Sequence, residues 1–313
     1  MKEYDYKAIP YKERLTTLCG IALNQYNVIH IDIQWFLANC NDANKVVAFI
    51  TKSVLDELRD LYPEVLTQDT GTIPDALSRV KERTGQKFVV IIDEWDVIIR
   101  DGSMTEAIQD AYLNFLRGMF KGVEPTKYIQ LAYLTGILPI KKEKTQSAVN
   151  NLDEFTMLQA DELAPYIGFT EEEVKELCGE YGRNFDKVKK WYDGYLLNGY
   201  QVYNPKAVVS VMTKGKFRSY WSETGSYEAI VPLICMNYDE LKNAIIEMLS
   251  GSEVKVDTAT LKNDPAKIQN RDDVLTYLIH LGYFGYNEDT EMAFVQNEEI
   301  RQELITAVKK QQL

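Results

Sequence analysis

The chain has 313 residues, of which 45% are hydrophobic and 26% charged, which predicts a soluble globular protein with one large domain or two ordinary ones. Its 35 Lys and Arg stand against 47 Asp and Glu, so the net charge at neutral pH is −12. A field of that sign repels phosphate backbones and anionic lipid, which lowers the expectation of general nucleic-acid binding without excluding a local basic patch.

The sequence also argues against several other classes of protein. No run approaches the roughly 18 apolar residues of a membrane span, and the first residues lack the apolar segment of a secretory signal. Four cysteines without a C-x-x-C pair encode neither a zinc site nor a disulfide framework, and two histidines cannot form a His-rich metal site. We therefore expect a protein of the reducing cytoplasm that has no membrane association.

The first half of the chain alternates between strand and helix patterns. Runs rich in β-branched residues predict strands, and apolar residues at helical spacing predict helices that stop at Pro63 or Gly85. The predicted elements, in order, are a strand over 26–33, helices over 43–62 and 73–84, a strand over 88–92, a helix over 105–121 and a strand over 129–136. This β-α-α-β-α-β order predicts a parallel α/β sheet with right-handed crossovers.

The pattern changes after Pro139. A polar connector without hydrophobic periodicity extends to about residue 151, and short helices follow, one of which begins with a capping box formed by Thr170 and Glu173. The last hundred residues predict a helix over 241–249, a helix around 274–278, a hairpin over 283–295 and a final helix over 298–310. Helices closed by a hairpin resemble a winged helix. We expect an α/β domain over 1–155 and a mostly helical, winged-helix-like domain over 156–313.

The strongest local motif is the segment Phe88–Glu94, five apolar residues followed by Asp93 and Glu94. This is the Walker B pattern of P-loop nucleotide hydrolases. A buried parallel strand has its carboxyl end at the ligand crevice, where the first acid can hold Mg²⁺ and the second can activate water. The simpler interpretation, a core strand that ends in a solvated acidic turn, remains open from these residues alone.

Two further polar residues follow predicted strands of the same sheet. Thr135 lies at the end of the third strand, where nucleotide hydrolases of the AAA class carry a sensor residue that bonds the γ-phosphate or the attacking water. Asp32 ends the first strand and is expected at the same rim. Taken alone, Thr135 is better explained as a residue that ends a strand before Gly136, and Asp32 is also open to interpretation as a strand-end acid.

The glycine-rich phosphate loop, G-x-x-x-x-G-K-[ST], does not occur in these 313 residues. The single Gly-Lys pair is Gly215-Lys216, and Phe217 follows where Ser or Thr is required. The residues before Tyr26 leave too little room for a strand, a loop and a helix. The motif set therefore contains the Mg²⁺ half of a nucleotide site without the phosphate half.

Five segments in a fixed order resemble the bacterial AAA-ATPase-like family whose members carry a DUF1703 nuclease-like domain of the PD-(D/E)xK type. The segments are Val89–Asp96, Leu134–Ile140, Gly168–Val174, Trp191–Tyr195 and Val202–Pro205. Asn297–Arg301 is similar to the motif that closes the family's ATPase region. The resemblance extends over about residues 21–305.

The resemblance implies a P-loop-type ATPase module followed by a helical and winged-helix segment, with ATP and Mg²⁺ as cofactors. Carried over by position, Asp93 is the Mg²⁺-coordinating acid, Glu94 the catalytic base and Thr135 the sensor. Family members carry a Walker A motif and a nuclease domain that this sequence lacks, so we expect a truncated or degenerate ATPase with weak or no hydrolysis.

Two alternatives stay open. The chain is either a non-enzymatic scaffold that binds a partner or DNA through the winged-helix-like region, or a module whose ATPase is completed by an upstream segment or another chain. There are two small basic groups, Lys187, Lys189 and Lys190 in one and Lys214, Lys216 and Arg218 in the other. They could meet phosphate or DNA, although solvated surfaces explain them better. The sequence does not indicate an oligomeric state.

Overall fold

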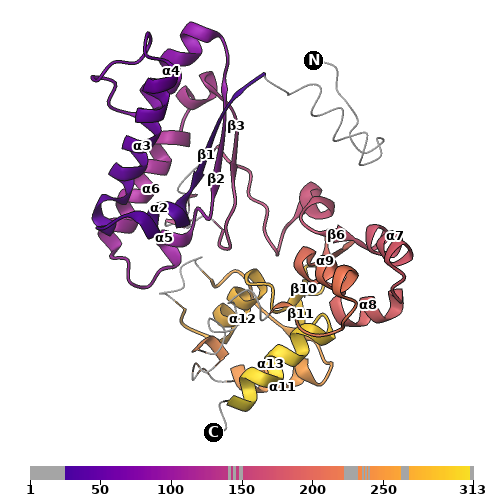
Figure 1. Ribbon diagram of the computed structural model, residues 1–313. Helices are drawn as coiled ribbons and strands as arrows, with labels where there is room; N and C mark the ends of the chain where they lie inside the picture. Colours follow the sequence, from indigo (N-terminus) through magenta and orange to yellow (C-terminus); the bar gives the residue numbers. More distant parts are fainter. Residues whose placement is uncertain are drawn as a thin grey trace. The chain divides into compact units, whose positions relative to one another are not determined.

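The computed structural model describes residues 25–139, 142–143, 146–147, 151–221, 232–234, 236, 238, 240–261 and 268–310. The chain divides into two compact units, Met1–Asp153 and Glu154–Leu313 (Figure 1). The division falls two residues before the boundary expected from the change in sequence pattern. Residues 1–24, for which the sequence predicts no secretory signal, lie outside the described part.

A three-stranded parallel sheet organises the first unit. Its strands are β1 (Asn27–Asp32), β2 (Phe88–Asp93) and β3 (Ile129–Leu134), in the spatial order β1-β2-β3. The parallel α/β architecture predicted from the strand and helix order is therefore confirmed. The register pairs Asp32 with Asp93, so the carboxyl ends of β1 and β2 meet at one rim.

The helices of this unit form one layer against the sheet (Figure 1). Apolar residues at helical spacing on α3, α4 and α6 enter the same core as Ile31, Val90 and Ile92 of the strands. Thr72 caps the start of α4, and Gly85 ends it in the left-handed conformation with φ 77°. The helical elements are α2 (Ile33–Asn39), η2 (Ala43–Lys45), α3 (Val46–Leu61), α4 (Ile73–Thr84), α5 (Val97–Arg100), α6 (Glu106–Phe120) and η3 (Glu124–Lys127).

The opposite face of the sheet carries exposed apolar side chains. Successive strand residues point to opposite faces, and the register places Val28, Val89 and Leu131 in one row and His30, Ile91 and Tyr133 in the next. The exposed fractions are 63% for Val28, 55% for Leu131 and 48% for Tyr133. Parallel sheets are normally buried on both faces. In the described residues of this unit, all helices pack on the other face.

Three local features of the first unit differ from the sequence prediction. Ile33 begins α2 instead of ending the strand, because the Asp32 side chain accepts a hydrogen bond from the Trp35 N–H and caps a helix there. Helix α5 has four residues, too few to show a period. The connector after Pro139 contains two-residue antiparallel strands, β4 (Lys142–Glu143) and β5 (Gln146–Ser147), which also carry no detectable pattern.

The second unit begins with helices packed on a small antiparallel sheet of order β6-β8-β7. The predicted capping box is confirmed, since the Thr170 side chain accepts from the Glu173 N–H while the Glu173 carboxylate accepts from the Thr170 N–H. The sheet was not predicted, because its strands have two to four residues. The elements are η4 (Asp161–Tyr166), β6 (Phe169–Thr170), α7 (Glu171–Tyr181), α8 (Phe185–Tyr192), β7 (Tyr195–Leu197), β8 (Tyr200–Tyr203) and α9 (Pro205–Lys214).

The rest of the second unit has a separate core, with a second antiparallel sheet of order β10-β11-β9. The predicted helices and hairpin are present. The elements are α11 (Leu241–Leu249), β9 (Val254–Lys255), α12 (Arg271–His280), β10 (Gly285–Asn287), β11 (Met292–Phe294) and α13 (Glu298–Lys310). Among the described residues, no helix has the length and apolar composition needed to cross a membrane.

Candidate functional site at the rim of the parallel sheet

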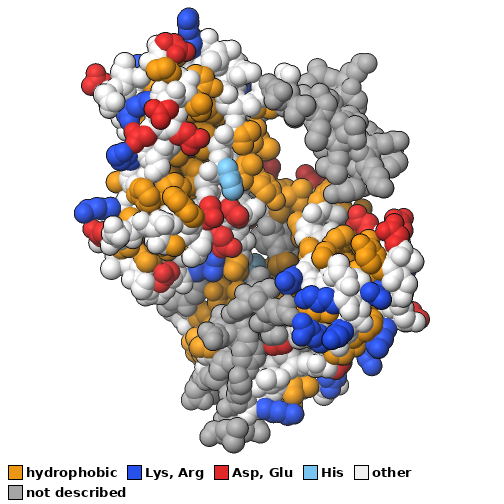
Figure 2. Space-filling model, viewed as in Figure 1, with side chains coloured by type: hydrophobic (Ala, Val, Ile, Leu, Met, Phe, Trp, Pro, Cys, Tyr) orange, Lys and Arg blue, Asp and Glu red, His pale blue; other side chains and the backbone are white. Residues whose placement is uncertain are grey.

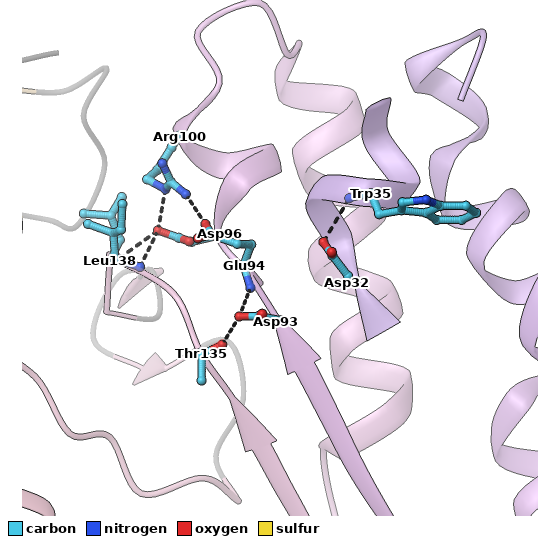
Figure 3. Close-up of polar contacts among 9 residues, drawn as sticks. Asp32, Trp35, Asp93, Glu94, Asp96, Arg100, Thr135 and Leu138 are labelled. Atoms are coloured by element: carbon cyan, nitrogen blue, oxygen red, sulfur yellow. Dashed lines mark hydrogen bonds and ion pairs between the residues drawn. The ribbon is translucent and has the colours of Figure 1, made fainter. Parts of the chain in front are cut away.

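Asp93 and Thr135 meet at the carboxyl ends of β2 and β3 (Figure 3). The Thr135 hydroxyl donates a hydrogen bond to Asp93 Oδ1, and the Glu94 N–H donates to the same oxygen at 3.0 Å. The Thr135 N–H donates to the Ile92 carbonyl at 2.9 Å, which extends the pairing of β3 with β2 up to this residue. Two of the three residues singled out in the sequence are thus in direct side-chain contact, and Asp93 remains exposed to solvent.

Glu94, the third residue, occupies the turn that follows β2. Its backbone has φ 52°, in the left-handed region that side chains other than glycine rarely adopt. Its carboxylate forms an ion pair with Arg100, with 2.6 Å between Oε2 and Nη2. Burial raises the pKa of Glu94, and the nearby carboxylates Asp96 and Asp93 raise it further, while Arg100 lowers it. A carboxylate with a raised pKa is suited to exchange a proton.

Asp96 is fully buried beneath this turn (Figure 3). Its Oδ2 accepts hydrogen bonds from the Ile137 N–H at 3.2 Å, the Leu138 N–H at 2.8 Å and Arg100 Nε at 2.8 Å. A Cβ atom on Gly136 would lie 2.6 Å from Asp96 Oδ1, so only glycine leaves room for this approach. Asp96 therefore holds the segment after β3 against the turn after β2, and Arg100 connects it to Glu94.

Asp32 lies at the same rim, as expected, but is engaged differently. Its Cα is the register partner of Asp93, while its Oδ1 accepts from the Trp35 N–H at 2.9 Å. Its charge still acts at the rim, since it contributes to the raised pKa of Glu94. The side chain serves mainly to begin α2.

The sequence prediction missed Asp96 and Arg100 as parts of this site. Asp96 is contained in the segment that carries the family resemblance, but the sequence pattern assigns it no chemical role. The signal that could have identified the pair is their i,i+4 spacing, which brings Asp and Arg side chains together on a helix. The remote partners of Asp96, Ile137 and Leu138, have no sequence signal because they contribute backbone N–H groups.

The side-chain oxygen atoms at the rim are suitable ligands for a Mg²⁺ ion that is bound together with phosphate. Mg²⁺ prefers oxygen ligands and is commonly held by one or two carboxylates plus substrate phosphates and water. Asp93 presents an exposed carboxylate with one oxygen oriented by two donors, and the Thr135 hydroxyl is adjacent. Within the described residues there is no cluster of three or more His, Cys, Asp and Glu side chains arranged for a metal ion, so the rim does not form an all-protein metal cage.

Comparison with protein families supports an AAA-ATPase-like domain in the first part of the chain. Residues 20–145 match the family model described as "Predicted AAA-ATPase". This range contains all three strands of the parallel sheet and the residues Asp93, Glu94 and Thr135.

The chain is also similar to an "Uncharacterized protein in vnfD 5'region" of Azotobacter chroococcum mcd 1, with 29% identity over 153 residues. The match covers 48% of this chain and 29% of that relative, so the chain spans less than a third of the relative's length. Among solved structures, the Aeropyrum pernix ORC2 protein in its ADPNP–ADP complexes aligns with 11% identity and a TM-score of 0.38. That alignment covers 96% of this chain and 82% of the other.

Proposed function

We propose that the first unit is an AAA-ATPase-like nucleotide module in which the sheet rim provides the Mg²⁺ side of the nucleotide site. Asp93 would hold Mg²⁺, Glu94 would activate the attacking water, and Thr135 would sense the γ-phosphate. The observation that carries the proposal is the contact between the Thr135 hydroxyl and the Asp93 carboxylate at the carboxyl ends of two parallel strands. Ligands of open parallel sheets bind at such ends.

One face of the sheet carries no helix among the described residues of the first unit, and this supports a location for the phosphate half of the site. Strands β1, β2 and β3 follow one another in one direction, and right-handed crossovers therefore place their helices on a single face. For the helix that follows a strand upstream of β1 to cover the exposed face, the connection to β1 must cross the sheet in the opposite direction. That strand would therefore lie beside β3 and parallel to it. Its following loop would then lie next to Thr135. Such a segment belongs to a longer chain or to another chain, because the 313 residues contain no phosphate-loop motif.

This chain by itself is proposed to bind Mg·ATP weakly and to hydrolyse it negligibly. In a phosphate loop, the backbone N–H groups and the lysine make most of the contacts with the phosphates. In addition, the ion pair with Arg100 occupies the carboxylate assigned as the base. The gene sequence 5′ of the Met1 codon provides a separate check, since an in-frame G-x-x-x-x-G-K-[ST] there would indicate an active, complete ATPase.

Isothermal titration with Mg·ATP tests the proposal. We expect weak binding, with a dissociation constant of about 1 mM. Asp93→Asn should abolish the binding of Mg·ATP. Asp56→Asn, a control on an exposed carboxylate of α3, should retain it. Equal binding by wild type and Asp93→Asn, or no binding by the wild type, would overturn the assignment of Asp93. Micromolar affinity would overturn the claim that the phosphate half is missing.

The alternative function, a scaffold that contacts DNA through a winged-helix-like segment, has one supporting observation. Helix α11, strand β9, helix α12 and the β10–β11 hairpin follow in the order of a winged helix, and β9 pairs with β11. Two features argue against insertion of this segment into a groove of DNA, however. None of the α12 residues is exposed, and the hairpin turn carries Glu288, Asp289 and Glu291. A nuclease-domain partner rests on the family resemblance alone.

A further inference from the structure

A concentration of positive charge lies in the second unit. Residues 183–218 contain eight Lys and Arg and two Asp, a net charge of +6, whereas the whole chain has −12. Figure 2 shows Lys and Arg side chains gathered beside hydrophobic ones on the second unit. A local charge of opposite sign to the rest of the chain indicates a binding surface for an anion.

The structure joins the two basic groups that lie more than 20 residues apart in the sequence. Lys187 Nζ of α8 lies 4.4 Å from the centre of the Phe217 ring, which follows α9. The Tyr192 hydroxyl donates to the Arg218 carbonyl at 2.9 Å and accepts from the Arg218 N–H at 3.1 Å. We call the resulting set the α8–α9 basic surface: Lys187, Lys190, Lys214, Lys216 and Arg218.

A fixed turn presents this surface. Arg183 donates from Nε and Nη2 to the Met212 carbonyl at 3.2 and 2.7 Å. Gly215 ends α9 with φ 67°, and a Cβ atom there would lie 3.1 Å from the Arg183 guanidinium. The turn that carries Lys214 and Lys216 is therefore tied to the start of α8.

The pairing of the lysines separates this surface from an ordinary solvated helix. On the neighbouring side, Lys175 and Lys189 each contact Glu171 at 2.6 Å. Lys187, Lys190 and Lys216 are exposed and form no ion pair within the described part of the chain. Aromatic rings lie beneath the cations, with Lys214 at 5.0 Å and Arg218 at 5.2 Å from the Tyr220 ring centre. Three cations of this surface, Lys187, Lys190 and Lys216, are thus exposed without an acidic partner among the described residues.

We propose that the α8–α9 basic surface binds the phosphate backbone of a nucleic acid. Several spaced cations match the repeated charges of a polyanion better than a single small anion, and lysine contacts to phosphate give affinity without sequence preference. The surface is distinct from α12 and the acidic hairpin turn. It is equally independent of the nucleotide rim, because none of its residues belongs to the first unit.

Fluorescence anisotropy with labelled DNA duplex and single strand, between about 50 and 200 mM salt, tests this proposal. We expect salt-dependent binding by the full chain. The triple variant Lys187→Ala, Lys190→Ala and Lys216→Ala should lose about tenfold or more in affinity at low salt. Its salt slope should fall by about 0.9 for each duplex phosphate contact removed, or about 0.7 for single strands.

A matched control removes the same charge elsewhere. The triple variant Lys45→Ala, Lys52→Ala and Lys121→Ala changes three exposed lysines of the first unit and should retain wild-type affinity. Absence of binding at low salt, or equal losses in both triple variants, would overturn the proposal. Displacement of DNA by an equal charge of polyglutamate would overturn it in favour of an acidic protein partner. Asp93→Asn should bind DNA normally, which separates this test from that of the nucleotide site.

Discussion

Asp96 and Leu138 are 42 residues apart in the chain, and the Leu138 N–H donates to Asp96 Oδ2 at 2.8 Å in a fully buried position. This contact fixes the turn after β2 to the segment after β3. Asp93 directly precedes the turn after β2, and Thr135 directly follows β3. The geometry of the candidate site therefore depends on Asp96, a residue that does not reach solvent.

Replacing Asp96 with alanine should destabilise the first unit by about 3 kcal/mol, because two backbone N–H groups and Arg100 lose a buried charged acceptor. Urea unfolding followed by tryptophan fluorescence measures the change. Asp56→Ala removes an exposed carboxylate of α3 and should cost much less stability than Asp96→Ala. Equal effects of the two changes would contradict a structural role for Asp96.

Gly136→Ala should destabilise the protein by about 2 kcal/mol, since the new methyl group meets Asp96 Oδ1 and Trp95 Cδ1, both at 2.6 Å. The matched control is Gly118→Ala in the interior of α6, where a Cβ atom meets nothing within 4 Å. There alanine should stabilise by about 0.5–1 kcal/mol through helix propensity. Thermal melts of both variants give the comparison, and a neutral Gly136→Ala would show that the turn can relax.

Arg100→Gln should raise the pKa of Glu94 further, because Arg100 is the neighbour that opposes the effect of burial and of the surrounding acids. Carbon-13 NMR titration of the Glu94 carboxyl measures the pKa directly. Lys52→Gln on α3 removes a cation that Glu94 does not sense and should leave its titration unchanged. A lowered Glu94 pKa in Arg100→Gln would mean that the ion pair does not form in solution.

Glu299 is buried on α13 and accepts from the Tyr220 N–H at 2.5 Å and the Trp221 N–H at 3.0 Å. Burial raises its pKa from 4.5 to about 7, with Glu303 adding to the rise. The folded state therefore holds a proton that the unfolded state has released between these two pH values. Its contribution to stability is full below pH 4.5 and is lost as the pH rises through about 7.

Glu299→Gln keeps an acceptor for the two N–H groups and removes the titration. We expect the variant to gain stability relative to wild type as the pH rises from 4.5 to about 7. Urea midpoints across this range test the prediction. A difference between variant and wild type that does not vary with pH would show that Glu299 is ionised in the folded state throughout.

His280 acts in the same pH range with the opposite sign. Burial lowers its pKa from 6.5 to about 4, so the stability it contributes is present above pH 6.5 and is lost as the pH falls toward about 4. His280→Phe should remove this acid sensitivity, and the same change at the exposed His30 should not. Urea midpoints at several pH values distinguish the two. Wild type should show a flatter pH profile than either His280→Phe or Glu299→Gln, because the opposing effects of His280 and Glu299 compensate.

The sequence predicted the parts of the fold that depend on local pattern. The apolar run before Asp93 identified the central strand, and the capping box at Thr170 identified the start of α7. Elements that were missed are too short to show a period, as in α5, β6 and β7. The convergence of Asp93 with Thr135 followed from parallel strands ending at a common rim.

Other parts of the candidate sites could not be predicted because they arise from tertiary contacts. The partners of Asp96 are backbone N–H groups, which every residue but proline carries. The α8–α9 basic surface required knowledge that Phe217 lies against Lys187. The buried state of α12 also has no sequence signal, since its first residues are Arg271, Asp272 and Asp273.

The left-handed backbone of Glu94 has an evolutionary consequence. Conformations of this kind cost of order 1–3 kcal/mol when the residue is not glycine, so glycine at this position would make the chain more stable while deleting the carboxylate. Selection for robust folding alone would favour that replacement. A glutamate retained here in natural variants of the chain would therefore record continuing selection for the chemistry of its side chain.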